Sequence, residues 1–510
     1  MAKKEKASHP KILSMRELSF YLSGAVGSGM VFSIMSSLIT DFYMNVMRLN
    51  WVFVFLLMLL ARIWDSFTDP MMGVIMDRMN PKRGKMRSWL MYAPGIIMVF
   101  TFAMFFIPGG AEQEAGTMLM VYAAITYVIW GLAFTVVDIP FWSLPLAMTP
   151  HEKERGQTIS LGRMTNGIGA AVPMALFMIL TPVLARTMEG ASELVRNERM
   201  YMIIALICAI GGGILLFATP FNVKERVPLP KAENKGALKN VLTCKPLMLT
   251  ALMGILAGGR YMLQAGAAHV ARFAFYPNID PNNLPAGQTL EIAVADSIAS
   301  VAFALQIATA AGMLAAMIAV PILLGRFNYK QMLIGSCLVG GVAGLVLYFM
   351  HPGFMVAAAM LLLVAIPVGV INSVGFAMVG DALDFMEWQK GLRYNGLGLA
   401  CQSFVLKLGN ALATAAIVLV YPLVDLNPGE SAGDVNLTTI DPAKRPGVQR
   451  GFFSIISIIP AISLLIAIIP MLFYDLTGEK KETVMRELSE RRAAEEEAAQ
   501  ALAEWNRQNP

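Results

Sequence analysis

The chain carries little charge for its length. Of its 510 residues, 15% are Asp, Glu, Lys or Arg and 56% are hydrophobic, and the mean hydropathy is +0.59. Soluble globular proteins carry about 25% charged residues, so this composition excludes an ordinary soluble domain and indicates an integral membrane protein. The formal net charge of +5 does not indicate a nucleic-acid partner, because the basic residues follow a membrane topology.

Cysteine and histidine are also scarce, and no enzyme motif is present. The four cysteines lack the spacing of metal ligands, and we do not expect a disulfide framework. The sequence contains no nucleophile elbow, P-loop or zinc signature. We therefore expect no enzymatic activity and no cofactor, and transport without an ATP site would run on an ion gradient. His269 is expected to be a packed, hydrogen-bonded residue, with a proton relay as the alternative.

Long hydrophobic runs, in contrast, are abundant. A membrane helix needs about 20 mostly apolar residues, and the chain offers twelve such runs. They cover residues 18–44, 51–76, 88–108, 117–148, 159–185, 200–219, 246–275, 292–324, 332–350, 354–384, 397–421 and 451–474. The sequence therefore predicts an all-α polytopic membrane protein.

The basic residues assign a side to each connection. With the N-terminus inside, 28 Lys and Arg fall in inside segments, seven in outside loops and five within the spans. This asymmetry predicts that both termini lie in the cytoplasm. We expect the protein to be located in the inner (plasma) membrane of a cell. The predicted parts are a tail 1–17, a six-helix bundle 18–219, a central loop 220–245, a second six-helix bundle 246–474 and a tail 475–510, which reads as a solvated helix.

The two bundles show a faint internal repeat. Asp138 precedes Arg163 by 25 residues in the first bundle, and Asp381 precedes Lys407 by 26 in the second. Two six-helix halves repeated in parallel are the plan of the major-facilitator fold, in which substrate binds near the midplane between the halves. We therefore expect this fold.

A pair of carboxylates lies inside the second hydrophobic run. Asp65 and Asp69 are one helical turn apart, and Thr68 lies between them. Like charges at this spacing repel each other, so they require a cation, a basic partner or a shared proton. Because carboxylate and hydroxyl oxygens suit Na⁺ or a proton, the pattern predicts a cation-coupling site. The alternative is a structural ion pair between Asp65 and Arg62.

Candidate sugar ligands lie on the fourth run. Asp138 and Trp142 share a helix face, with Thr135 one turn earlier. An indole ring stacks on a pyranose while a carboxylate accepts hydrogen bonds from its hydroxyls. Trp142 alone would also fit an interfacial anchor. Arg163 and Lys407 are cations within spans that require anionic or carbonyl partners, although Arg163 has a purely structural alternative.

Charged residues also gather at two cytoplasmic turns. We expect them to form ion-pair networks that hold one conformation closed, with a solvated turn that only fixes topology as the equal alternative. The predicted network residues are Arg62, Asp77, Arg78, Arg83, Asp381, Asp384, Glu387 and Arg393.

Two long segments resemble the signatures of glycoside–pentoside–hexuronide:cation symporters. They are Ala61-Arg-Ile-Trp-Asp-Ser-Phe-Thr-Asp-Pro-Met-Met-Gly73 with Arg83-Gly-Lys85, and Trp130-Gly-Leu-Ala-Phe-Thr-Val-Val-Asp-Ile-Pro-Phe-Trp-Ser-Leu144 with Glu154-Arg155. The resemblance extends over essentially all twelve helices, and it implies a monomeric carrier of a small sugar or glycoside in the lipid bilayer.

The resemblance also assigns roles to individual residues. It implies cation binding by Asp65, Asp69 and Thr135, and sugar contacts by Asp138, Trp142, Arg163 and the helix-11 lysine Lys407. Thr68 replaces an asparagine of the best-known member and Phe134 a tyrosine, while Ser28 and Gly29 stand where that member has a Lys-Asp pair. A glycoside other than a galactoside, a pentoside or a hexuronide is therefore at least as well supported.

These observations predict a sugar:cation symporter that works by alternating access, with Na⁺ favoured over H⁺. Two alternatives remain open. One is a proton-coupled or non-sugar carrier of the same fold, and the other is a sugar sensor that does not transport.

Overall fold

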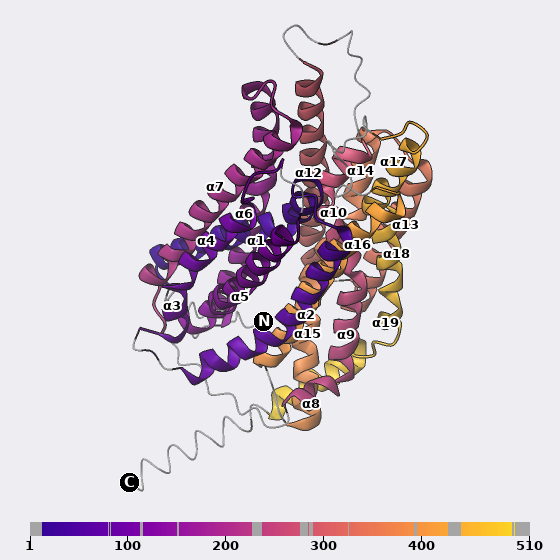
Figure 1. Cartoon of the computed structure of the whole chain (residues 1–510). Coiled ribbons are helices and arrows are strands. Elements are labelled where there is room, and N and C mark those ends of the chain that lie inside the picture. The colour runs from indigo at the N-terminus through magenta and orange to yellow at the C-terminus, as the bar shows by residue number, and fades with distance from the viewer. Residues whose placement is uncertain are drawn as a thin grey trace. The chain divides into compact units, whose positions relative to one another are not determined.

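A computed structural model shows the described part of the chain as a succession of helices (Figure 1). The described residues are 13–79, 81, 83–112, 116–149, 152–226, 237–275, 284, 289–324, 326–391, 395–426, 440–491 and 494, and some side chains within the helices are left out. Within these ranges no residue lies in a β-strand, which confirms the all-α prediction.

Every predicted span corresponds to helical structure. Residues before the central loop form α1 (Met15–Asp41) with the π-helical turn η1 (Phe42–Val46), α2 (Trp51–Arg78), α3 (Lys85–Leu90), α4 (Ala93–Met104), α5 (Thr117–Met148), α6 (Glu152–Thr187) and α7 (Glu193–Asn222). Eleven segments of the described chain are long and apolar enough to cross a membrane. The one predicted span that is not among these eleven, 51–76, forms α2, and some side chains of this helix lie outside the described set.

The elements from residue 237 onward include both short pieces and long helices, and the first of them, α8 (Ala237–Leu242), lies within the predicted central loop. They are α8 (Ala237–Leu242), α9 (Lys245–Leu256), η2 (Ala257–Tyr261), α10 (Met262–Ala265), α11 (Ala267–Phe273), α12 (Leu290–Leu323), α13 (Tyr329–Met350), α14 (Phe354–Val364), α15 (Ile366–Lys390), α16 (Asn395–Leu423), α17 (Arg445–Phe453), η5 (Ser454–Ile456), α18 (Ile458–Ile466) and α19 (Ile468–Leu472).

The span predicted over 246–275 is interrupted rather than continuous. A 3₁₀ turn, η2, separates α9 from α10, and Arg260 within it is 1% exposed. Its guanidinium donates to the carbonyl oxygens of Gly254 (3.2 Å) and Ala257 (2.7 Å) and to the hydroxyl of Tyr261 (2.8 Å). Backbone carbonyls that the broken helix frees therefore satisfy Nη1 of the buried guanidinium, while its Nε has no hydrogen-bond partner among the described residues.

Contacts divide the chain into two compact units that are described separately. Unit 1 contains Met1–Ala232, Ala265–Phe303 and Thr414–Gly451, and unit 2 contains Glu233–Gln264, Ala304–Ala413 and Phe452–Pro510. Unit 1 thus takes in two stretches from beyond the central loop. The division into six-helix bundles 18–219 and 246–474 stays a prediction.

In unit 1 the helix α1 packs along α6 and α7. Glycines allow the backbones of α1 and α6 to approach closely: a Cβ atom at Gly29 would lie 2.1 Å from the carbonyl oxygen of Asn166, and one at Gly169 would lie 2.0 Å from that of Val26. Small residues are the usual means of close helix packing in membranes. This crossing fixes α6 beside α1.

In unit 2 the last described helix, residues 478–491, packs against α15. Lys481 forms an ion pair with Asp381, and the Trp388 indole donates to Glu487 (2.7 Å). Two apolar side chains of this helix are 2% exposed: Val484 and Leu488. The tail was expected to be a solvated helix, but its apolar residues at i and i+4 give it one buried face.

Candidate functional site

The predicted cation ligands lie at the contact between α2 and α5. Asp65 and Asp69 are each 6% exposed, one turn apart on α2. The Thr135 hydroxyl of α5 donates to Asp69 Oδ1 (2.9 Å), whereas the Thr68 hydroxyl donates to the backbone oxygen of Asp65 (3.3 Å). The structure therefore brings Asp69 and Thr135 together, while the Thr68 hydroxyl is hydrogen-bonded within its own helix.

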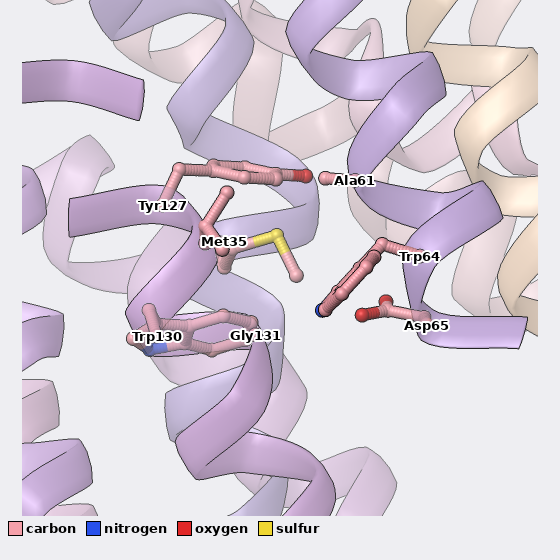
Figure 2. A pocket seen from close by; sticks show the side chains of 8 residues that line it. Met35, Ala61, Trp64, Asp65, Tyr127, Trp130 and Gly131 are labelled. Carbon is pink, nitrogen blue, oxygen red and sulfur yellow. The ribbon is translucent and has the colours of Figure 1, made fainter. Parts of the chain in front are cut away.

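Asp65 lines a small pocket that is otherwise mostly apolar. Figure 2 shows its carboxylate and the Trp64 indole extending from α2 toward Met35 of α1 and toward the part of α5 that carries Trp130 and Gly131. The remaining lining residues are Ala61, Tyr127 and Val128. An apolar wall lowers the local dielectric constant, which strengthens the attraction between a carboxylate and a cation.

Gly131, which has no side chain, lies next to the Asp65 carboxylate. A Cβ atom at Gly131 would lie 3.5 Å from Asp65 Oδ1, which is ordinary contact, and a longer side chain would extend into the region that the carboxylate occupies. Trp130 beside it is 1% exposed, donates to the Thr101 hydroxyl (2.9 Å) and stacks on Phe134 with 5.1 Å between ring centroids. These contacts hold the α5 wall of the pocket in place.

The predicted sugar ligands continue along α5. Asp138 and Trp142 are half-buried, and the Arg163 guanidinium of α6 lies over the Trp142 ring, with its Cζ atom 3.8 Å from the centroid. This cation–π contact covers one face of the indole. The adjacent Phe141 stacks on Tyr21 of α1 at 5.1 Å. The structure thus brings Trp142 and Arg163 together.

The chain as a whole matches a family model described as MFS/sugar transport protein, over residues 20–276 and 294–478. The chain belongs to this family. The resemblance to glycoside–pentoside–hexuronide:cation symporters is confirmed, since the relatives of this family member include proteins named as such carriers.

Three relatives cover nearly the whole chain. The glucuronide carrier protein homolog of Escherichia coli (strain K12) is 25% identical, with 95% of this chain and 98% of its own covered. The uncharacterized symporter YnaJ of Bacillus subtilis (strain 168) is 25% identical (94% and 96%), and the putative glycoside/cation symporter YagG of E. coli is 24% identical (95% and 97%).

Solved structures support the fold alone. The D-xylose-proton symporter is similar with a TM-score of 0.60 at 12% identity, covering 91% of this chain and 98% of its own. A bacterial homolog of the lysosomal transporter Spinster, in an inward-facing unoccupied conformation, has a TM-score of 0.59 at 14% identity, covering 91% and 97%. The predicted major-facilitator fold is thereby confirmed, and the chain is a multi-pass membrane protein of a sugar-transporter family.

Positions 28 and 29 of α1 are both buried. Ser28 is 1% exposed, and Gly29 lies against the backbone of Asn166 at the crossing of α1 with α6. A charged side chain at Gly29 would displace that backbone, so this crossing leaves no room for a polar sugar contact from that position.

Lys407 lies on α16 within unit 2 and is 9% exposed. The cation ligands and the α5 residues all lie in unit 1. The sugar contact that the resemblance implies for Lys407 therefore stays a prediction.

The predicted gating residues are placed in part. Asp381 pairs with Lys481 of the tail, a partner that the sequence did not indicate, and Asp384 and Glu387 are half-buried on the same helix. Arg83 is exposed. The side chains of Arg62, Asp77, Arg78 and Arg393 lie outside the described residues, so a network around them, and the alternative pair of Arg62 with Asp65, stay predictions.

Sequence reasoning missed two features of the site. Tyr127 and Gly131 line the pocket at the spacing of four that continues to Thr135, and this periodicity on α5 could have identified them.

Glu225 was also missed: its carboxylate accepts hydrogen bonds from the backbone N–H groups of Lys85, Met86 and Arg87 (2.8–2.9 Å) at the start of α3. It satisfies donors that a helix N-terminus leaves unpaired.

Proposed function

We propose that this chain is a sugar:cation symporter of the inner membrane that works by alternating access, with Na⁺ as the favoured coupling ion. One observation carries the proposal: a single face of α5 holds Thr135, which is hydrogen-bonded to Asp69, and then Asp138 and Trp142 within two further turns. The two predicted binding sites are therefore built on one continuous helix. Both termini are proposed to be cytoplasmic and the carrier to be a monomer.

The coupling follows from electrostatics. Without a cation, Asp65 and Asp69 repel each other across one helical turn, and the Thr135 hydroxyl is the donor that partly offsets the charge of Asp69. A bound cation neutralises the pair and holds α2 and α5 in one register. That register sets the position of Asp138 and of Trp142 beneath Arg163, so the sugar meets a preorganised site.

The names of relatives support the substrate class. A glucuronide carrier homolog, a putative glycoside/cation symporter and an isoprimeverose transporter of Lactiplantibacillus pentosus match most of this chain. The stacked Trp142 and the adjacent Asp138 suit a pyranose, and Arg163 beside them would also suit a hexuronide carboxylate. We propose a pyranoside or hexuronide as substrate.

Uptake by purified protein in proteoliposomes tests this function. Labelled glycosides and hexuronides should accumulate when an inward Na⁺ gradient is imposed and not when choline replaces Na⁺. Asp65→Asn should abolish the accumulation, because it removes a charge that binds the cation. Asp425→Asn is the matched control, since Asp425 is exposed and lies outside the site. Uptake that is unchanged by Asp65→Asn would overturn the symport proposal.

Proton coupling is a second candidate, favoured by the pocket around Asp65. Most of its lining is carbon from Met35, Trp64 and Trp130, and the described residues supply few oxygen ligands there beyond Asp65 itself. A carboxyl group in such surroundings suits a proton better than a metal ion, which requires several oxygens. Accumulation driven by an inward pH gradient without Na⁺ would assign the coupling ion as H⁺.

A further inference from the structure

A buried polar cluster in unit 1 lies apart from the proposed site. At its centre is Asp41 of α1, which is 0% exposed and accepts hydrogen bonds from Tyr201 and from Asn45 Nδ2 (2.7 Å). Arg272 Nη2 and His269 Nδ1 of α11 each lie 3.5 Å from the same carboxylate. An ionic group this deeply buried is strongly destabilising unless its partners satisfy it, so these contacts define the cluster.

The cluster joins segments that are distant in sequence. Asp41, Tyr201, His269 and Tyr421 come from α1, α7, α11 and α16, and each lies toward the end of its predicted span that the sequence assigns to the outside. Two of these helices precede the central loop and two follow it. A carrier that alternates its access must separate some contacts between such segments when it opens outward.

Hydrogen bonding in the cluster favours a neutral His269. Asn45 Nδ2 donates to the Tyr421 hydroxyl oxygen (2.7 Å), and that hydroxyl lies 2.7 Å from His269 Nδ1. The relay is satisfied when Tyr421 donates its proton to an unprotonated Nδ1. The other ring nitrogen, Nε2, is buried with no hydrogen-bond partner among the described residues. A second proton on this ring would interrupt the relay and leave a buried charge poorly satisfied.

Among the described residues, the charged groups that act on His269 are Asp41 from α1 and Arg272 from its own helix. Glu193 of α7 pairs with Arg272, and the hydroxyls of Tyr201 and Tyr421 also belong to the cluster. The Arg272 guanidinium forms ion pairs with both Asp41 (3.5 Å) and Glu193 (2.9 Å). An imidazolium would gain attraction from Asp41, but it would repel Arg272 and lose the hydrogen bond from Tyr421, at a site where these side chains are at most 4% exposed.

We propose that this cluster is a proton-binding site that latches the external side of the carrier shut while His269 is neutral, and that opens when His269 takes up a proton from outside. The proposal rests on the alternating access proposed above. An opened, hydrated histidine titrates near pH 6.5. The latch therefore holds above about pH 6.5 and weakens progressively as the external pH falls below that value.

Thiol labelling of Thr40→Cys tests the latch without any transported substrate. Thr40 is 1% exposed beside Asp41, and its hydroxyl has no hydrogen-bond partner among the described residues, so replacing it with the unbranched cysteine breaks no hydrogen bond there. In intact cells, an impermeant thiol reagent should label this cysteine slowly at pH 7.5. Labelling should accelerate by up to about tenfold per pH unit below about pH 6.5, which is the limit for one linked proton.

Three controls test whether the change in labelling rate comes from the cluster. The rate is divided by that of Met118→Cys, whose parent side chain is 84% exposed, so that the thiol's own pH dependence cancels. The chain without an added cysteine gives the background from the native thiols, of which Cys208, Cys244 and Cys337 are buried. His351→Asn leaves the cluster intact, and its left-handed backbone (φ 39°) is one that asparagine tolerates.

In the Thr40→Cys background, His269→Asn should make the labelling rate independent of pH, whereas His351→Asn should retain the acceleration. If His269→Asn expresses poorly, Tyr421→Phe serves instead: it removes the donor to Nδ1 and should reduce the acceleration. A rate that does not change with pH in the Thr40→Cys chain, or a full acceleration in the His269→Asn chain, would overturn the proposal. Failure of sugar uptake would leave this readout unaffected, so the two proposals fail separately.

Discussion

Single side chains determine how the two proposed sites are connected. Asp69 and Thr135 lie 66 positions apart, yet a 2.9 Å hydrogen bond joins them, and Arg163 lies 3.8 Å above the ring of Trp142. The sequence identified all four residues as candidates: charge and helical spacing indicated Asp69, Trp142 and Arg163, and the family resemblance implied the cation role of Thr135. It also grouped Thr68 with the cation ligands, whereas the Thr68 hydroxyl is hydrogen-bonded to the Asp65 backbone, because a threonine in a helix readily bonds to the preceding turn.

Removing the Thr135 hydroxyl should weaken cation binding. Thr135→Ala leaves Asp69 without its α5 donor and removes an oxygen from the candidate site. A hydrogen bond of this kind contributes about 1 kcal/mol, so cation affinity should fall about fivefold. Titration of purified protein with Na⁺, followed calorimetrically, measures the change.

Thr135→Ser is the matched control for this change, because it keeps the hydroxyl and should bind Na⁺ nearly as tightly as the parent chain. An alanine variant with parental affinity would show that Thr135 is not part of the cation site.

Helix contacts set the positions of these residues. The crossing of α1 with α6 brings Gly29 and Gly169 against opposing backbone carbonyls, and it carries Arg163 on α6 to the same unit as α1 and α5. The sequence predicted each helix from its hydrophobic run. It did not predict the break at η2 or the docked tail, because Arg260 and Lys481 find their partners through folding rather than through periodicity.

A methyl group at the α1–α6 crossing should destabilise the protein. In Gly169→Ala the new Cβ atom would lie 2.0 Å from the Val26 carbonyl oxygen, so the two helices must separate. Overpacking of this kind costs about 1–3 kcal/mol, and the midpoint of thermal unfolding of the detergent-solubilised protein should fall accordingly.

The neighbouring Gly167→Ala serves as the control, because no atom lies within 4 Å of a Cβ atom built there. Alanine favours a helix over glycine by up to about 1 kcal/mol, so this variant should be as stable as the parent chain or slightly more stable. Equal destabilisation of both variants would mean that the close crossing is not the cause.

At the scale of the whole molecule, the cation ligands, the α5 sugar candidates and the Asp41 cluster all belong to unit 1. Unit 1 includes residues 265–303 and 414–451, which the sequence assigns to the second bundle. Folding therefore places charged residues from beyond the central loop beside α1 and α7. Transport by such a molecule requires that cation and sugar each influence the same conformational equilibrium.

Cation and sugar should accordingly strengthen each other's binding by equal factors. If saturating Na⁺ increases sugar affinity by some factor, saturating sugar must increase Na⁺ affinity by the same factor, because the coupling free energy is shared. Couplings of this kind are typically about 5–150-fold. Paired calorimetric titrations on purified protein, each in the presence and absence of the other ligand, measure both factors.

If Asp138 belongs to the sugar site, Asp138→Asn should reduce both coupling factors toward one, which is the value without coupling. Sugar affinity that does not change between Na⁺ and choline would argue against symport with Na⁺, and repetition across a pH series would then test H⁺.

The sequence by itself determined the membrane class, the helices, the family and the residue types at the site, because hydropathy, helical spacing and charge at membrane depth are local properties. Only the tertiary structure decided which of these residues meet. Arg272 reaches Asp41 across 231 positions, and the choice of Thr135 as the partner of Asp69 depends on how α2 packs on α5. Such contacts follow from helix packing, which no local pattern encodes.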